Sequence, residues 1–399
     1  MPFRSALAET VSTDGRTMAI RIWEYTVGGG RFAEATDEAF PIALRREGRA
    51  MIGALVRSCS PELRRRLRIA WDPQAGTPPD DVAIDRIDSV AALERWFDGA
   101  ADEPSERSPV KRERGGLLII APETDGRLAR WTERAEKSGA RLLSPCAEFV
   151  RLASDKTATT RRLAEAGVPV PREIRGEQSA ESLASETRSD LARPLRCVIK
   201  DRFGCGGVDM VRWRSGDWGS TGGIDGVPHP LVWPRERWHV EQEHEGTSVG
   251  IFVLVGPGGY RILPPIAQRQ GEGGSYLGGS YPLAAAPAQR AMRLARRVVT
   301  AMPKSGASFG IDLILGNEEQ EDVVLEVNPR LVSSWIGLSQ RIGPYLGDAL
   351  LAGDSYDVEP QPIDRRRREL IVDPTPLMFD VSHDGPSATT NGRSTEEAT

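Results

Sequence analysis

The sequence predicts two folding patterns in succession, an α/β domain followed by an α+β domain. Residues 18–150 alternate short apolar strands with helical stretches, and this β-α-β rhythm is typical of a parallel sheet. Residues 196–316 instead contain mainly strands, glycines and turns, and one amphipathic helix is predicted over 287–302. The chain has 399 residues, which at roughly 100–200 residues per domain suggests two or three domains.

The first half opens with a strand that runs into glycines. Residues 18–23 alternate in polarity, lead to Gly28-Gly29-Gly30, and are followed by a helical pattern through about Cys59. The polar segment 100–116 is expected to be a linker. The other elements predicted in this half are a loose arm over 1–17, a buried strand over 117–121, a helix ending near Lys137 and a short apolar pair at Leu142 and Leu143.

The second half begins with a helix that Ser154 or Asp155 caps and that ends near Gly167. Strands are expected at about 310–315 and 323–328, and residues 337–352 are expected to be helical. The predicted division is therefore a flexible arm over 1–17, an N-terminal α/β domain over 18–150, a second domain over 151–352 and a C-terminal extension over 353–399 that is disordered from about 380.

Composition excludes several classes of protein. Apolar residues make up 39% and charged residues 27%, as in ordinary globular proteins, and the longest apolar stretch, 117–121, is far too short to cross a membrane. The net charge of −5 argues against a nucleic-acid partner. The four cysteines have no Cys-x-x-Cys spacing and the N-terminus does not resemble a secretory signal, so a cytoplasmic location is expected.

Residues 309–330 are the most informative segment, because two apolar strands flank a polar loop. If the hairpin is symmetric about Glu319, Asp312 lies opposite Glu326, since each is seven residues away. Opposed side chains share one face with Cβ atoms ~4.5–5.5 Å apart, and Asn328 points the same way. Two carboxylates so close repel each other unless a cation lies between them, and Mg²⁺ prefers such oxygen ligands. The alternative is a solvent-facing hairpin with incidental acids.

A second segment joins a lysine to a glycine-rich turn. A strand ends in Lys200, and Gly204, Gly206 and Gly207 follow. Glycines allow backbone N–H groups to approach phosphate oxygens, although this is not a Walker A sequence and an ordinary glycine turn is the alternative. Arginine supplies nearly all the basic charge, and Lys156 and Lys200 are two of five lysines in the chain. A lysine suits single phosphate oxygens, which gives these two a candidate role.

A third segment, 238–254, carries a polar break between two strands. His239, Glu241 and Glu243 share one strand face. A zinc site of His239, Glu241 and His244 is a poor alternative, because His244 has the wrong parity and no cysteine is near. We interpret the segment as a hinge whose backbone offers one carbonyl and one N–H to an adenine edge.

These three segments, in this order, resemble the ATP-grasp superfamily over about 150–340. The resemblance implies an N-terminal Rossmann-like (pre-ATP-grasp) domain, then an ATP-grasp domain of two α+β subdomains, and ATP with one or two Mg²⁺ ions, Mn²⁺ being an alternative. It implies that Arg330 and Lys200 act in catalysis, Arg330 by steadying the transferred phosphoryl group. The implied nucleotide-binding residues are Lys156, Lys200, Gly204, Gly206, Gly207, Glu241, Gln242, Glu243, His244 and Ser248, and the implied metal ligands are Asp312, Glu326 and Asn328.

Three further stretches, 23–30, 121–126 and 328–338, resemble the subgroup that includes tyramine–glutamate ligase, as does the segment 276–282. Bacterial relatives accompany one-carbon pterin pathways, so the amine need not be tyramine. One departure is Ser248, where many family members carry a ribose-binding glutamate. Gly28–Gly30, Glu123 and Asp125 are candidates for a substrate pocket, and turn chemistry at strand ends is the alternative.

The resemblance implies a ligase that makes an amide bond through an acyl phosphate. A carboxylate attacks the γ-phosphorus of ATP, and an amine then displaces phosphate. The expected partners are small carboxylates and amines, with a homodimer as an option. An ATP-grasp kinase and a non-catalytic nucleotide-binding module are the alternatives. Cys205 within the glycine turn is disfavoured as a nucleophile, because such a turn simply tolerates a small residue.

Overall fold

The computed structural model describes thirteen stretches of the chain. They are residues 19–34, 36, 38–99, 116–174, 196–206, 210–214, 223–224, 227–228, 234–256, 259–271, 276–342, 345–351 and 377–380. The predicted arm over 1–17, nearly all of the linker over 100–116, Gly207 and the predicted disorder beyond 380 lie outside these residues.

The N-terminal half forms a five-stranded parallel sheet in the order β3-β2-β1-β4-β5. Every residue of β4 is buried, which is typical of a parallel sheet covered on both faces. The predicted β-α-β pattern is therefore confirmed. The strands are β1 (Ile20–Glu24), β2 (Leu67–Trp71), β3 (Ala83–Arg86), β4 (Gly116–Ile120) and β5 (Arg141–Leu142).

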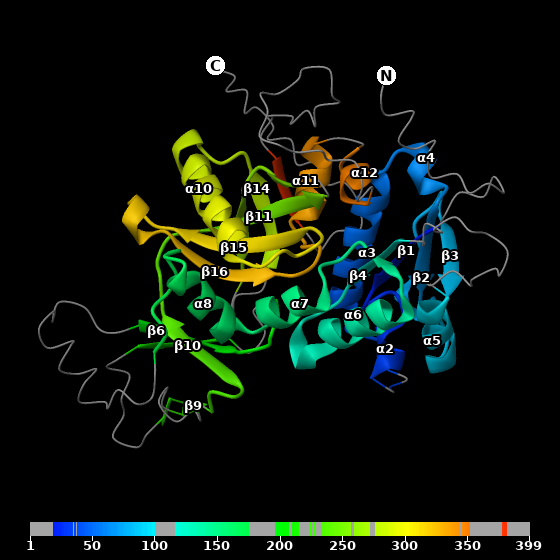
Figure 1. The fold of residues 1–399 in the computed structure, drawn as a ribbon, viewed down its shortest axis with the longest axis horizontal. Helices are drawn as coiled ribbons and strands as arrows, with labels where there is room; N and C mark the ends of the chain where they lie inside the picture. Colours follow the sequence, from blue (N-terminus) through cyan, green and yellow to red (C-terminus); the bar gives the residue numbers. More distant parts are fainter. Residues whose placement is uncertain are drawn as a thin grey trace, which may run out of the picture.

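Helices cover both faces of this sheet (Figure 1). Helix α3 packs on one face with strand residues such as Ile22 and Ile69. Helices α5 and α6 pack on the other face around Trp23 and Ile119. The helical segments of this half are α2 (Gly30–Ala33), α3 (Ile42–Arg57), α4 (Pro61–Arg64), α5 (Val90–Asp98), α6 (Arg127–Ser138), α7 (Ala147–Ser154), η1 (Pro73–Ala75) and η2 (Thr124–Gly126).

The second half is built on antiparallel sheets. A three-stranded sheet has the order β10-β6-β7, and a seven-stranded sheet has the order β16-β15-β11-β13-β14-β17 with β12 paired to β11. The strands are β6 (Arg196–Asp201), β7 (Val211–Arg214), β10 (Trp238–Gln242), β11 (Thr247–Gly256), β12 (Gly259–Ile262), β13 (Ile266–Gln270), β14 (Tyr276–Tyr281), β15 (Phe309–Leu315), β16 (Val323–Asn328) and β17 (Leu377–Asp380), and a separate pair is β8 (Gly223–Ile224) with β9 (Val227–Pro228).

In the described part of this half, the helical segments are α8 (Lys156–Glu165), α10 (Ala285–Ala301), α11 (Trp335–Ile342), α12 (Leu346–Leu351) and the 3-10 turn η5 (Glu319–Glu321). Asp155 is the N-cap of α8, because its side chain accepts a hydrogen bond from the Ala158 N–H at 3.1 Å. The helical prediction over 337–352 is confirmed for 337–342 and 346–351. Two helices occupy this region, and the sequence places Gly343-Pro344, which do not favour a continuing helix, between them.

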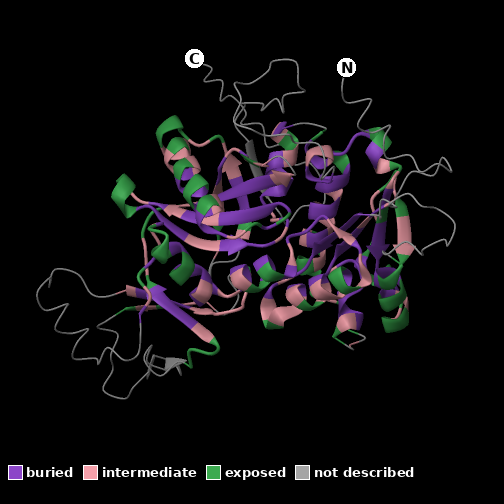
Figure 2. Ribbon diagram, viewed as in Figure 1, coloured by how far each residue is buried: buried purple, intermediate pink, exposed green. Residues whose placement is uncertain are grey.

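One hydrophobic core joins the two halves. It runs from the N-terminal sheet through α3 to α11, α12 and the strand residue Phe252. Figure 2 shows buried residues in purple on α3 and on the neighbouring strands. The N–H of Ser60 donates to Asp348 at 2.7 Å, which fixes α12 to the end of α3. The predicted boundary at residue 150 falls inside α7, and the separateness of the two domains stays a prediction.

The shared core leads to a prediction about the free energy of unfolding. Leu338 on α11 is buried against α3, so Leu338→Ala is expected to lower the free energy of unfolding by about 2–5 kcal/mol. Both sheets should lose stability in one transition in denaturant, followed by circular dichroism. The exposed Val90→Ala is the control and should change stability little. Two transitions, of which only one moves in Leu338→Ala, would contradict the shared core.

Candidate active site

Three oxygen-bearing side chains meet on one face of the hairpin formed by β15 and β16. Asp312 pairs with Glu326, and Gly310 pairs with Asn328, so the predicted register is confirmed. A bulge after Asp312 shifts the register, so the pairing beyond it is no longer symmetric about Glu319. The Asn328 amide donates to Asp312 Oδ2 at 2.8 Å, and the amide of Gln268 donates to Asp312 Oδ1 at 2.7 Å. The hairpin therefore fixes the aspartate from two sides.

The two carboxylates respond to each other's charge. Burial, followed by the charge of Glu326, raises the pKa of Asp312 to about 7. Burial would also raise the pKa of Glu326, but the charges of Lys156 and Lys200 outweigh it and lower that pKa. Without a cation, Asp312 therefore tends to keep a proton near neutral pH while Glu326 is ionised. Two half-buried carboxylates beside an amide oxygen form a hard donor set that suits Mg²⁺.

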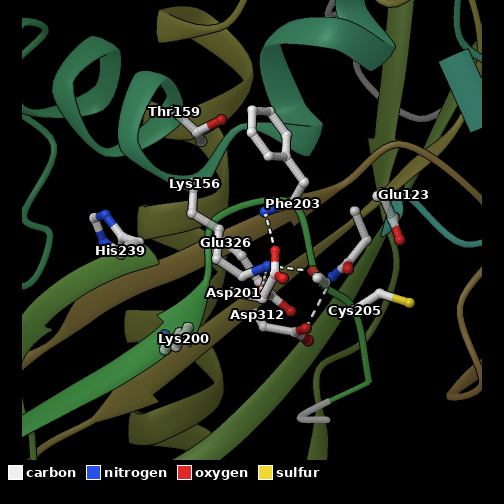
Figure 3. Close-up of polar contacts among 12 residues, drawn as sticks. Glu123, Lys156, Thr159, Lys200, Asp201, Phe203, Cys205, His239, Asp312 and Glu326 are labelled. Atoms are coloured by element: carbon white, nitrogen blue, oxygen red, sulfur yellow. Dashed lines mark hydrogen bonds and ion pairs between the residues drawn. The ribbon is translucent and has the colours of Figure 1, made fainter. Parts of the chain in front are cut away.

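Two lysines reach this face from different elements (Figure 3). Lys156 is the first residue of α8, lies 3.7 Å from Glu326 Oε2 and donates to the carbonyl of Gly204. Lys200 near the end of β6 forms an ion pair with Glu241. Burial would lower the pKa of Lys200, but the charges of Glu241, Glu326 and Asp312 raise it. Both predicted lysines thus lie beside the carboxylates, as the sequence suggested.

The glycine turn follows β6 directly. The Phe203 N–H donates to the Asp201 carboxylate at 2.8 Å, and Gly206 adopts a φ of +70°, which favours glycine. A Cβ at Gly204 would approach Asp201 to 2.9 Å. Burial raises the pKa of the Cys205 thiol, which lies 3.6 Å from the Thr124 hydroxyl, so Cys205 does not have the environment of an activated thiolate.

The predicted hinge follows at the end of β10. Glu241 is buried in its pair with Lys200, and Glu243 pairs with Arg196 at 2.8 Å. Backbone bonds from Gln242 to Arg172 and from Glu243 to Arg196 occupy two N–H groups. The N–H of His244 makes no backbone hydrogen bond within the described ranges. The acidic side chains of this segment are engaged, so the backbone is the part left to meet a ligand.

Ser248 and Gln268 form a polar layer beside the predicted metal ligands. The Ser248 hydroxyl donates to Gln268 Oε1 at 2.7 Å, and Gln268 in turn donates to Asp312. Ser248 thus has a structural partner in addition to its predicted ribose role, which stays a prediction. Sequence reasoning missed Gln268, because strand β13 carries no motif that distinguishes it.

The N-terminal half contributes Glu123. Arg330 donates from Nε to Glu123 Oε1 at 3.0 Å, and Glu123 is only 4% exposed. Its second oxygen, Oε2, is buried and has no hydrogen-bond partner among the described residues. Burial would lower the pKa of Arg330, but the charge of Glu123 raises it. A residue far away in the sequence therefore pairs with the arginine that follows the predicted metal ligands.

The other residues predicted to line a substrate pocket, Asp125 and Gly28–Gly30, have different surroundings from Glu123. Asp125 is exposed and pairs with Arg127 at 2.9 Å. Gly29 has a φ of +84°, and a Cβ at Gly30 would approach the Tyr25 carbonyl to 2.3 Å, so turn geometry explains these glycines. Only Glu123 of this group meets a predicted site residue.

His239 and Thr157 extend the Lys200–Glu241 pair. His239 Nε2 lies 3.0 Å from Glu241 Oε2, and its Nδ1 lies 3.0 Å from the Thr157 hydroxyl. Sequence parity placed His239 beside Glu241, whereas Thr157 was missed, although it directly follows Lys156. In the described ranges, no three His, Cys, Asp or Glu side chains are grouped to hold a metal. Asp312, Glu326 and Asn328 instead combine two carboxylates with an amide.

The described parts contain no helix with the length and apolar character that a membrane span requires.

In a comparison with protein families, residues 153–334 match the ATP-grasp domain family. A search of curated proteins returns no match. The fold is similar to that of a protein assigned to the ATP-grasp superfamily from Archaeoglobus fulgidus, with a TM-score of 0.57 and 19% identity, covering 91% of this chain and 99% of that one.

Two enzymes of known structure are also similar. The biotin carboxylase of Campylobacter jejuni, in its β-γ-ATP complex, has a TM-score of 0.56 and 14% identity over 86% of this chain and 72% of that chain. The N5-carboxyaminoimidazole synthetase of Staphylococcus aureus, in complex with ADP, has a TM-score of 0.52 and 14% identity over 85% and 78% of the two chains. The predicted fold, an N-terminal parallel sheet followed by an ATP-grasp domain, is confirmed.

The pKa of Asp312 makes a prediction for metal binding. Below about pH 7 a proton must leave Asp312 before the carboxylate binds Mg²⁺, so the dissociation constant should rise with falling pH, by up to about tenfold per pH unit, and level off above pH 7. Calorimetric titration of the nucleotide-free protein with Mg²⁺ at pH 6, 7 and 8 measures this. Asp312→Asn should abolish the pH dependence, and equal affinity at all three pH values in the unaltered protein would contradict the assignment.

Proposed function

We propose that this chain, in which residues 153–334 carry an ATP-grasp domain, is an ATP-dependent ligase that joins a carboxylate to an amine. The proposal depends on one observation: Asp312, Glu326 and Asn328 share one sheet face, and the charges of Lys156 and Lys200 act on it from neighbouring elements. This face combines hard metal ligands with fixed positive charges, which is what transfer of a phosphoryl group requires.

The nucleotide is proposed to lie between the glycine turn and the hairpin. Lys156 and Lys200 would contact the α- and β-phosphates, and the backbone of the glycine turn would cover the triphosphate. Each cation of the site already has a carboxylate near it: Lys156 has Glu326, Lys200 has Glu241 and Arg330 has Glu123. Because the resident charges nearly cancel, a tetra-anionic nucleotide is expected to bind together with its metal ion.

The adenine edge is proposed to bind at residues 241–244. Since the side chains of Glu241 and Glu243 are engaged in ion pairs, the backbone of this segment provides the recognition. The unengaged N–H of His244 and a carbonyl of the same segment fit the donor and acceptor of an adenine edge.

The proposed reaction has two steps. A carboxylate oxygen attacks the γ-phosphorus, the bond to the β,γ-bridging oxygen breaks, and ADP and an acyl phosphate form. An amine then attacks the acyl carbon, phosphate leaves with the C–O bonding pair, and the amine nitrogen loses a proton. Bound Mg²⁺, held by Asp312, Glu326 and Asn328, would neutralise phosphate charge. Lys200 and Arg330 would hold the nucleotide and the transferred phosphoryl group.

Glu123 supports a substrate pocket beyond the phosphates. Its Oε1 accepts from Arg330, while the buried Oε2 has no partner within the described residues. A buried carboxylate oxygen without a donor is costly, and an ammonium or amine N–H would satisfy it. We propose that the amine approaches from this side, next to the arginine that steadies the phosphoryl group.

Substrate identity rests on the sequence resemblance described above. It favours glutamate as the acid and an aromatic or other small amine as the nucleophile, in the biosynthesis of a methanofuran- or pterin-type cofactor. The cytoplasmic location and the homodimer stay predictions of the sequence.

Two alternatives use the same nucleotide site. A small-molecule kinase would release ADP with one substrate and need no amine. A non-catalytic module would bind nucleotide without turnover. The complete set of Asp312, Glu326 and Asn328 favours an enzyme, because a binding module does not need a metal held at the γ-phosphate.

The first prediction of the proposal concerns the metal ligand Glu326. Glu326→Ala is expected to lower ATP turnover by about 10²–10³-fold or more, because it removes a ligand at the position where charge develops. The fold should remain intact, since the substitution also removes the charge that raises the pKa of Asp312. Glu319→Ala, an exposed glutamate in the same hairpin, is the matched control and should keep full activity. Full turnover in Glu326→Ala would contradict the metal assignment.

The second prediction concerns the two organic substrates. Purified protein with Mg-ATP should release ADP fastest when both L-glutamate and an amine are present, with tyramine first in a panel of amines. The second half-reaction needs the amine, so ADP release should depend on both. ADP release with a single substrate and a phosphorylated product would favour the kinase. Nucleotide binding without ADP release by any pair would favour the binding module.

A further inference from the structure

A buried chain of hydrogen bonds ends at Lys200. Thr157 Oγ1 lies 3.0 Å from His239 Nδ1, His239 Nε2 lies 3.0 Å from Glu241 Oε2, and Glu241 Oε1 accepts from Lys200 Nζ. Thr157, His239 and Glu241 are all buried, and Lys200 and His239 are direct cross-strand partners on β6 and β10. Four side chains from three elements thus form one connected chain.

The Glu241 carboxylate determines which nitrogen of His239 carries a hydrogen. The Glu241 carboxylate accepts only, so His239 Nε2 must carry the hydrogen that faces it. In the neutral imidazole Nδ1 then has a lone pair, and the Thr157 hydroxyl donates to it. The opposite tautomer would set the lone pair of Nε2 against a carboxylate oxygen. Thr157 therefore holds the imidazole ring at its other nitrogen, in the orientation that supplies Glu241 with a donor.

We infer that Thr157 and His239 are positioning residues that hold Lys200, through Glu241, for the phosphates of the nucleotide. The inference rests on the proposed function and assigns to it two residues that do not themselves touch the ligand. Glu241 divides its two oxygens between two donors, and the carboxylate plane is thereby fixed. Without the histidine donor, the carboxylate is free to turn both oxygens toward Lys200 and draw the ammonium away from the phosphates.

The same hydrogen-bond chain connects the two lysines of the site. Thr157 directly follows Lys156 at the start of α8, so the hydroxyl that fixes His239 belongs to the turn that carries the first lysine. Asp155, on the other side of Lys156, pairs with Arg202 through Nε at 2.7 Å, just beyond Lys200. The start of α8 is therefore linked to both flanks of Lys200, and the spacing of the two ammonium groups is set by side chains outside the ligand pocket.

The test uses the full chain and Mg²⁺ with the non-hydrolysable analogue AMP-PNP, measured by calorimetry. Thr157→Val keeps the shape of the side chain but removes the hydroxyl, and we expect about 5- to 10-fold weaker binding. Thr157→Ser restores the hydroxyl and should bind within about twofold of the unaltered protein. Thr159→Val is the matched control: this buried threonine on the same helix donates to the Leu152 carbonyl instead, and its loss should leave AMP-PNP affinity unchanged.

A second readout separates positioning from general damage. Adenosine lacks the phosphates that Lys200 contacts, so its affinity, measured by NMR titration, should be the same in Thr157→Val and in the unaltered protein. Equal loss of adenosine and AMP-PNP affinity would reduce Thr157 to a structural residue and overturn the inference. Unchanged AMP-PNP affinity in Thr157→Val would also overturn it. Failure of the unaltered protein to bind AMP-PNP would instead overturn the proposed function itself.

A third readout needs no variant. The ¹⁵N chemical shifts of His239 in the unaltered protein report which ring nitrogen carries the hydrogen. Nε2 should be protonated whether the ring is neutral or charged, because it faces the Glu241 carboxylate. An unprotonated Nε2 would contradict the hydrogen bond from His239 to Glu241 and overturn the inference, even if Thr157→Val does not fold.

Discussion

The repulsion between two adjacent carboxylates is the constraint on which the site depends. Asp312 and Glu326 are direct cross-strand partners in an otherwise apolar hairpin, and both are half-buried. Two effects reduce this repulsion. The raised pKa of Asp312 favours its protonated form, and the charges of Lys156 and Lys200 lower the pKa of Glu326 and stabilise its ionised form. Such an arrangement costs stability and is relieved when a divalent cation replaces the proton.

Each surrounding cation reaches this face from a different element. Lys156 comes from the start of α8, Lys200 from the end of β6 and Arg330 from beyond β16. Their partners, Glu326, Glu241 and Glu123, come from three further places in the chain. The site therefore forms only when both sheets and the N-terminal half are assembled, which gives the shared core around α3 and α11 a functional role.

The sequence could predict the parts of the site that local periodicity controls. The hairpin register followed from strand alternation about Glu319. The scarcity of lysine, and positions beside a helix start and a glycine turn, singled out Lys156 and Lys200, whose contact with phosphates stays a prediction. The pairs Arg330–Glu123 and Thr157–His239 could not be predicted, since they join residues distant in the sequence that tertiary packing brings together. The sequence allowed two interpretations of Gly28–Gly30, a turn and a substrate pocket. The backbone angle of Gly29 and the crowding at Gly30 favour the turn.

A crystal structure with AMP-PNP and Mn²⁺ tests the central claim most directly, because the anomalous signal of Mn²⁺ locates the metal without reference to the protein. The account predicts a peak within about 2.0–2.3 Å of the Glu326 carboxylate and close to Asp312 and Asn328, bridging to the phosphates of the nucleotide. A nucleotide bound elsewhere, or a metal that contacts the phosphates but neither carboxylate, would contradict it.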